Sequence, residues 1–301
     1  MAQANGKVIL LGEHAVVHGF DAIAVGIERG ARARARVAAP AGLRLGHLSA
    51  VAGDGSELSH AYEALLRELA LGPHHVEAEL ELPPGAGLGA SAALGVVIAR
   101  AVLELHLPGG NSERVLAAAG AWERVFHGNP SGIDVAAAER GGCLLFSRSQ
   151  GVRAIGVGRE LSLVVALAGA PASTRKMVEQ VQQQLDRRPE IVQKTLEGIG
   201  ALVANARLCI ESGDLDALGQ LMNLNQMLLS GLFLSTEGIE RACAVARAAG
   251  ALGVKLTGAG GGGAVVALSA GDPEPLLSAF HAAGLPCFAT RVLPNAASRV
   301  P

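Results

Sequence analysis

Pro83-Pro84-Gly85-Ala86-Gly87-Leu88-Gly89-Ala90-Ser91-Ala92-Ala93 is the stretch of this sequence that says most about its fold. Residues 76–82 alternate between apolar and charged side chains and predict a strand with one buried face, while small residues running to about His106 predict a helix. Glycines let backbone N–H groups turn toward a ligand, and a helix start favours a phosphate. The stretch lacks the Gly-Lys-Ser/Thr of a Walker loop and the distant acid of a dinucleotide fingerprint. Taken alone, it supports a phosphate site and a plain tight turn about equally.

The rest of the chain mixes strands and helices without regular alternation. Short apolar or alternating runs predict strands over 4–12, 22–28, 31–37, 143–146, 152–157, 161–168, 253–256, 264–268 and 287–293. Helical periodicity covers 56–71, almost all of 173–250, and 274–283, and Asn111 or Ser112 can cap a further helix that carries Trp122. This pattern predicts an α+β protein rather than a doubly wound parallel sheet. A boundary is expected near residues 160–170.

Composition narrows the class of protein. The 301 residues carry a net charge of −2, half of them are hydrophobic and 17% are charged, which excludes wholesale disorder and a bulk electrostatic nucleic-acid surface. The longest apolar runs, such as 161–172, fall short of the roughly 20 residues that span a bilayer. The four cysteines show no metal-type or disulfide spacing. A reduced, cytoplasmic location is expected.

A second glycine cluster, Lys255-Leu256-Thr257-Gly258-Ala259-Gly260-Gly261-Gly262-Gly263, lies between two predicted strands. Four consecutive glycines cost conformational entropy. We therefore expect a close approach to this backbone, either by a ligand or by the first glycine loop, and favour that over a flexible hairpin.

Two further segments hold polar groups. In residues 123–134, Glu123 and Asp134 flank the turn Asn129-Pro130-Ser131-Gly132, an arrangement that suits a metal ligand and a base. On spacing alone the alternative is favoured, in which both acids are solvated. In Gly6-Lys7-Val8-Ile9-Leu10-Leu11-Gly12-Glu13-His14-Ala15-Val16-Val17-His18-Gly19, the lysine can snorkel to solvent, and the acid and histidines can line a pocket or cap a turn. The spacing excludes the His-Glu-x-x-His zinc helix.

Taken together, the four segments resemble the galactose, homoserine, mevalonate and phosphomevalonate kinases, and within that superfamily the mevalonate kinase family. They occur in the family's order over residues 6–263. The resemblance implies a two-domain α+β fold, with an N-terminal ATP- and phosphate-binding domain over 1–165, a C-terminal domain over 166–301 and the active site in the cleft between them. It implies ATP-dependent phosphorylation of the 5-hydroxyl of mevalonate, with Mg²⁺ as cofactor and a homodimer as the expected assembly.

The resemblance also implies roles for single residues. Asp134 matches the aspartate that takes the proton from the substrate hydroxyl, and Lys7 matches the lysine beside it. Ser91 and Glu123 match the Mg²⁺ ligands. These roles suit phosphoryl transfer, which needs positioning and charge neutralisation more than covalent help.

Substrate and nucleotide positions are implied in the same way. Glu13 and His14 match substrate-contacting positions, and Arg175, near the start of the second domain, is a further candidate for the substrate carboxylate or a phosphate. The ATP-binding positions are Pro84, Gly85, Ala86, Gly87, Leu88, Gly89, Ala90, Ser91, Gly258, Ala259, Gly260 and Gly261.

The sequence departs from the family pattern at two positions. Asn5 stands where the family usually has proline, and Ala90 replaces the first of two serines, which removes one hydroxyl from the loop. Alternatives remain: another kinase of the superfamily, such as phosphomevalonate or homoserine kinase, a non-catalytic ligand-binding member, or an α+β protein whose glycine loops are only structural. The continuation at residues 15–19 counts against a galactokinase.

Overall fold

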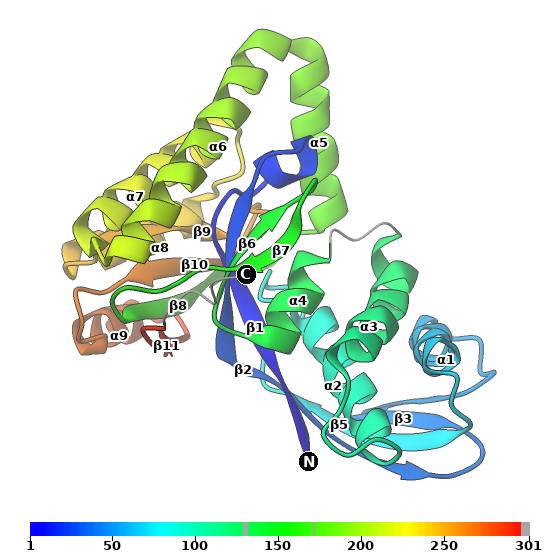
Figure 1. Ribbon diagram of the computed structural model, residues 1–301. Helices are drawn as coiled ribbons and strands as arrows, with labels where there is room; N and C mark the ends of the chain where they lie inside the picture. The colour runs from blue at the N-terminus through cyan, green and yellow to red at the C-terminus, as the bar shows by residue number, and fades with distance from the viewer. Residues whose placement is uncertain (129–131, 171, 296–301) are drawn as a thin grey trace. The chain divides into compact units, whose positions relative to one another are not determined.

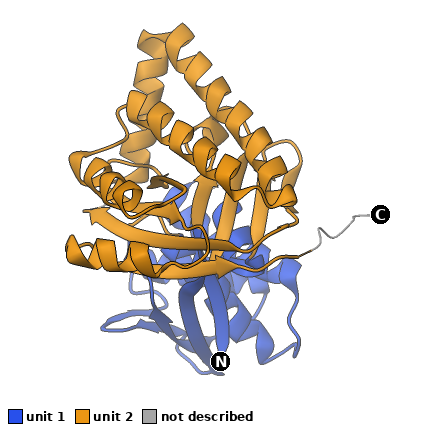
Figure 2. Cartoon of the chain, turned by 90° about the vertical axis from the view of Figure 1, so that its left-hand side faces the viewer, with its two compact units in different colours: residues 1–7, 28–84, 89–141 blue, residues 8–27, 85–88, 142–301 orange. Residues whose placement is uncertain are grey.

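The computed structural model describes residues 1–128, 132–170 and 172–295, which form two compact units (Figures 1 and 2). Unit 1 comprises residues 1–7, 28–84 and 89–141, and unit 2 comprises residues 8–27, 85–88 and 142–301. The chain changes unit inside its first strand and again inside the first glycine loop. The division at residue 165 stays a prediction.

In unit 1, strands are ordered β4-β3-β5-β2 (Figure 1). Their bounds are β2 Ala22–Val37, β3 Gly42–Leu45, β4 Leu48–Val51 and β5 His74–Leu80. The two predicted runs over 22–28 and 31–37 form one long strand, of which the part from Glu28 lies in this unit. On it, Arg34 lies opposite Glu77 of β5, so unlike charges face each other across the pair.

The helices of unit 1 are α1 Glu57–Leu69, α2 Ala90–Glu104, α3 Ser112–His127 and α4 Ile133–Arg140. Asn111 caps α3 as predicted, because its side chain accepts a hydrogen bond from the Arg114 N–H. Helix α2 contacts α3, α4 and β5, and its small residues let neighbours approach closely. A Cβ on Gly95 would lie 2.8 Å from Cδ1 of Trp122, which is buried in this core.

Unit 2 holds most of the remaining elements and is drawn in orange in Figure 2. The first strand, β1 Ala2–Leu11, enters it after Lys7 and leads to the short 3-10 helix η1 Ala15–His18. The other strands are β6 Cys143–Ser147, β7 Gly151–Ala154, β8 Leu161–Gly169, β9 Gly253–Thr257, β10 Gly263–Leu268 and β11 Cys287–Val292. The helices are α5 Thr174–Arg187, α6 Pro189–Ser212, α7 Leu215–Gly231, α8 Glu237–Ala248 and α9 Glu274–Ala282.

An antiparallel sheet of order β11-β8-β10-β9 organises unit 2, with α7 and α8 packed against it. Side chains of α7 cover the edge strand β9. Asn223 Oδ1 accepts from Val254 N at 3.1 Å, and Gln226 Oε1 accepts from Leu256 N at 2.8 Å. These bonds satisfy backbone groups that would otherwise stay open at a sheet edge.

The α+β prediction is confirmed, and most predicted elements lie within a few residues of their observed bounds. Strands β3 and β4 and helix α4 were not predicted, and the helical pattern over 173–250 divides into the four helices α5, α6, α7 and α8. Among the described residues, no helix is both long and apolar enough to cross a bilayer.

Candidate active site

The lysine and the aspartate of two distant segments meet in unit 1. Lys7 Nζ lies 3.1 Å from Asp134 Oδ1, and the Lys7 side chain is only 5% exposed against 38% for Asp134. Lys7 therefore does not snorkel to solvent. Asp134 stands in the first turn of α4, behind Gly132 with its φ of 84°. The aspartate is thus held beside a buried ammonium while one side of it stays open.

The second pair in unit 1 is Ser91 and Glu123. The Ser91 hydroxyl, on the first turn of α2, donates to Glu123 Oε1 of α3, and the Trp122 indole N–H donates to Ser91 Oγ at 3.3 Å. Burial raises the pKa of Glu123, and the hydrogen bond from Ser91 opposes that rise. The expectation that both acids are solvated is wrong for Glu123, which is 3% exposed, because α2 packs against α3 at this point.

Gly89, two residues before Ser91, occupies a position where a side chain would not fit. Its φ is 76°, and a Cβ there would lie 2.7 Å from Cγ of Lys7. A side chain at this position would displace the lysine that pairs with Asp134. The absence of a side chain at Gly89 therefore lets the first glycine loop pack directly against Lys7, within unit 1.

In unit 2 the two glycine loops contact each other through their backbones. A Cβ on Gly87 would lie 3.1 Å from the Thr257 carbonyl oxygen, and a Cβ on Gly263 would lie 3.1 Å from that of Ala86. The expected close approach is therefore confirmed, and the first loop makes it. Residues of both loops line one small hollow together with Ala172 and Thr174.

The Glu13-His14-Ala15 corner is strained. Ala15 N donates to Glu13 O at 2.7 Å, and His14 between them has φ 61° and ψ −45°, the values of a γ-turn that non-glycine residues rarely adopt. His14 Nε2 lies 2.8 Å from Ala259 O, so this nitrogen carries a proton and donates it. The imidazole thereby anchors the second glycine loop.

A buried ion pair stands next to that corner. Lys255 Nζ on β9 contacts Glu13 Oε1, both side chains are fully buried, and Asn225 Nδ2 donates to Glu13 Oε2 at 3.2 Å. Burial raises the pKa of Glu13, and the Lys255 ammonium opposes that rise. Ile9 N also donates to Thr257 Oγ1 at 2.8 Å. The first motif and β9 are therefore held together by buried polar contacts.

Arg175 lies in a different setting. Its side chain is 88% exposed on the first turn of α5, and its Nε donates to Glu179 at 2.8 Å. Of the predicted turn before Asp134, Asn129, Pro130 and Ser131 lie outside the described residues, as does Pro171 ahead of Arg175.

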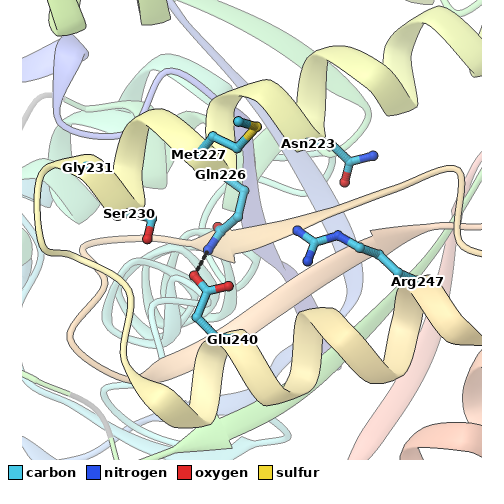
Figure 3. A pocket seen from close by; sticks show the side chains of 7 residues that line it. All are labelled: Asn223, Gln226, Met227, Ser230, Gly231, Glu240 and Arg247. Atoms are coloured by element: carbon cyan, nitrogen blue, oxygen red, sulfur yellow. Dashed lines mark hydrogen bonds between the residues drawn. The ribbon is translucent and has the colours of Figure 1, made fainter.

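A larger pocket of unit 2 lies between α7 and α8 and is lined by none of the predicted site residues (Figure 3). Gln226 links its wall to β9, because its Nε2 donates to Glu240 at 3.0 Å while its Oε1 accepts from Leu256 N. The figure shows Arg247 and Asn223 extending toward each other at one end of it.

Sequence reasoning did not identify Lys255 and Asn225 as partners of Glu13. One available signal was the scarcity of lysine, with Lys255 one of four in the chain and the first residue of the second glycine motif. Asn225 gave no signal, since a polar residue on a helix is ordinarily exposed.

Comparison with known proteins defines the class of this protein. Residues 56–142 match the N-terminal domain of GHMP kinases, and residues 201–285 match the GHMP kinase C-terminal domain. The chain belongs to the GHMP kinase family.

Several relatives within the family are mevalonate kinases. A mevalonate kinase of Aeropyrum pernix is 37% identical over 283 residues, covering 89% of this chain and 87% of that protein. A mevalonate kinase of Pyrococcus abyssi is 32% identical, with 97% and 95% covered. The crystal structure of L. major mevalonate kinase in complex with R-mevalonate is 33% identical and superposes with a TM-score of 0.87, covering 98% of this chain and 96% of that one.

Proposed function

We propose that this protein is a mevalonate kinase: it transfers the γ-phosphoryl group of ATP to the 5-hydroxyl of mevalonate and releases ADP and 5-phosphomevalonate. The substrate rests on the named relatives, which match over nearly the whole chain. ATP use is expected of a GHMP kinase. The observation that carries the chemistry is the 3.1 Å contact between Lys7 and Asp134.

In the proposed reaction Asp134 acts as the base. The substrate oxygen forms a bond to the γ-phosphorus, the bond from that phosphorus to the ADP oxygen breaks, and the hydroxyl proton passes to the Asp134 carboxylate. The Lys7 ammonium lies 3.1 Å from that carboxylate, where its positive charge would stabilise the alkoxide that forms as a substrate hydroxyl placed beside it loses its proton.

Ser91 and Glu123 are the proposed Mg²⁺ ligands. A hydroxyl and a carboxylate are the hard oxygen donors that Mg²⁺ takes alongside phosphate and water, and here the two already touch each other. When bound, Mg²⁺ supplies neutralisation of the phosphate charge. The Trp122 indole N–H orients the Ser91 oxygen, and burial keeps the Glu123 carboxylate poorly hydrated and available to a cation.

The glycine loops are the proposed ATP-binding segments, from Pro84 to Ser91 and from Gly258 to Gly261. Because glycine has no side chain, its backbone N–H group can approach a phosphate oxygen closely. Glu13 and His14 are proposed to serve the substrate, and the γ-turn centred on His14 fixes the backbone from which its imidazole extends. Arg175 has an exposed guanidinium that can reach a carboxylate or a phosphate.

We propose a homodimer as the assembly. Helix α7 presents apolar side chains to solvent in the single chain, with Leu224 46% and Met227 66% exposed. A second copy of the chain would bury them.

The proposed function is tested by ADP release with ATP and Mg²⁺ in the presence of mevalonate, phosphomevalonate, homoserine or galactose. We expect turnover with mevalonate only. Turnover of another alcohol would keep the kinase chemistry and assign a different acceptor. If no acceptor supports ADP release while ATP still binds, the result would contradict catalysis and favour a ligand-binding member of the family.

The burial of His14 predicts a pH dependence of stability. Burial lowers the pKa of His14 from 6.5 in the folded protein, so the unfolded chain binds more protons below that pH. The stability associated with neutral His14 is therefore complete above about pH 6.5 and is lost as the pH falls toward the folded pKa. We expect the free energy of unfolding of His14→Asn to fall less over this interval than that of wild type, as measured by urea titration. His18, whose pKa burial also lowers, provides the comparison through His18→Asn. Parallel pH profiles for wild type and His14→Asn would contradict the assignment.

A further inference from the structure

Two histidines of unit 1, outside the candidate active site, point their ring nitrogens at each other. His74 is the first residue of β5 and is buried, and His106 lies two residues beyond the end of α2 and is exposed. Their Nε2 atoms are 2.8 Å apart, and the rings are nearly perpendicular with centroids 5.0 Å apart. Segments 32 residues apart thus bring two metal-ligating atoms to one point.

The hydrogen bonds of His74 define its tautomer. Its Nδ1 lies 2.8 Å from the carbonyl oxygen of Gly72, which can only accept, so Nδ1 carries the proton. In the neutral ring, Nε2 then holds a free lone pair directed at His106. The Tyr62 hydroxyl donates to the His74 carbonyl at 2.9 Å and fixes the backbone at the same residue. A histidine whose second nitrogen donates to a backbone carbonyl is the usual arrangement of a metal ligand.

We propose that His74 and His106 form a two-histidine site for a borderline transition-metal dication, of the class of Cu²⁺, Ni²⁺ and Zn²⁺. Two imidazoles on one tetrahedral ion, with metal–nitrogen bonds of about 2.0–2.1 Å, place their nitrogens roughly 3.3 Å apart. The present 2.8 Å separation has to open by only a few tenths of an ångström, and exposed His106 is free to make that movement.

The proton balance of binding is simple. Without metal, His106 Nε2–H donates to His74 Nε2. On binding, the His106 proton moves from Nε2 to Nδ1, both Nε2 lone pairs bond to the ion, and no proton is released overall. Among the described residues no group of three or more histidine, cysteine or acidic side chains is placed to hold a metal, so water fills the remaining positions. Binding by two protein ligands is therefore expected to follow the Irving–Williams order and to exclude Mg²⁺.

The test is titration of the untagged protein with Cu²⁺, Ni²⁺, Zn²⁺ and Mg²⁺ by calorimetry. His106→Gln removes the exposed ligand and leaves buried His74 in place, so the fold is retained. The matched control is His47→Gln, at another exposed histidine of the same unit between β3 and β4. We expect wild type and His47→Gln to bind one Cu²⁺ or Ni²⁺ that His106→Gln binds at least tenfold more weakly. The Cu²⁺ spectrum of wild type should show coupling to two nitrogens, and that of His106→Gln should not.

Either of two results would overturn the site: equal affinity and stoichiometry in wild type and His106→Gln, or no transition-metal binding by wild type. Turnover of mevalonate with Mg²⁺ and ATP is expected to be the same in His106→Gln as in wild type. The metal titration can therefore be interpreted whether or not the proposed function is correct.

Discussion

Asp134→Ala is expected to abolish turnover while ATP binding persists. Removing a general base typically costs about 10²–10⁴-fold in rate, and here the same change also takes away the carboxylate that faces the Lys7 ammonium at 3.1 Å. We expect kcat to fall by about 10³-fold or more, because no other described carboxylate is paired with Lys7. The measurement is ADP release at saturating ATP and mevalonate, beside ATP binding by calorimetry.

Control variants distinguish loss of the general base from destabilisation of helix α4. Asp134 stands in the first turn of α4, where a carboxylate also stabilises the helix dipole. Asp216→Ala removes an exposed aspartate from the corresponding turn of α7 and should leave kcat unchanged. Asp134→Asn retains the volume and should be nearly as inactive as Asp134→Ala. Activity within tenfold of wild type in Asp134→Asn would refute the role of Asp134 as base.

Lys255→Met is expected to produce the largest loss of stability. The change leaves the Glu13 carboxylate fully buried with Asn225 as its remaining side-chain partner. Breaking a buried ion pair from one side costs about 3–5 kcal/mol, because the other charge stays desolvated. We expect the free energy of unfolding of Lys255→Met, measured by urea titration, to fall by about that amount. Lys194→Met, at an exposed lysine of α6, should change it by less than about 0.5 kcal/mol.

The double variant Glu13→Gln with Lys255→Met tests the pairing itself. Removing both charges eliminates the uncompensated one, so we expect the double variant to be more stable than Lys255→Met alone. Additive losses would show that the two residues stabilise the fold independently. Kinetics then reveal how Glu13 serves the substrate: a rise in KM for mevalonate without recovery in the double variant would indicate contact, and recovery would indicate positioning.

The local elements of this fold could be predicted from the sequence because their signals are local. The alternating strand, the small-residue helix and the Asn111 cap each depend on neighbouring residues. A close approach to the second glycine cluster could also be predicted, since four consecutive glycines are hard to explain unless something lies against them, but whether a ligand or the first loop makes it could not.

The burial of the acidic side chains and the partners they contact could not be predicted in this way. Glu123 is buried because α2 covers it, and spacing along α3 carries no information about α2. The pairing of Glu13 with Lys255 joins residues 242 apart, and Asn225 adds a third segment. Family resemblance supplied roles for Lys7 and Asp134, but only the three-dimensional structure shows the distance between them.

The interleaving of the two units has a consequence for the order in which a ribosome can complete them. All of unit 1 lies before residue 142, so the Lys7–Asp134 pair can form while more than half of the chain is still to be made. Unit 2 has to wait, because Ile9 bonds to Thr257 across 248 residues. At about 5–20 residues per second, the apolar end of β1 remains without that partner for several seconds or more. The nascent chain therefore carries a β1 that can pair with β2 but still lacks its contact with Thr257, and this is the stage at which chaperone binding or aggregation would compete with folding.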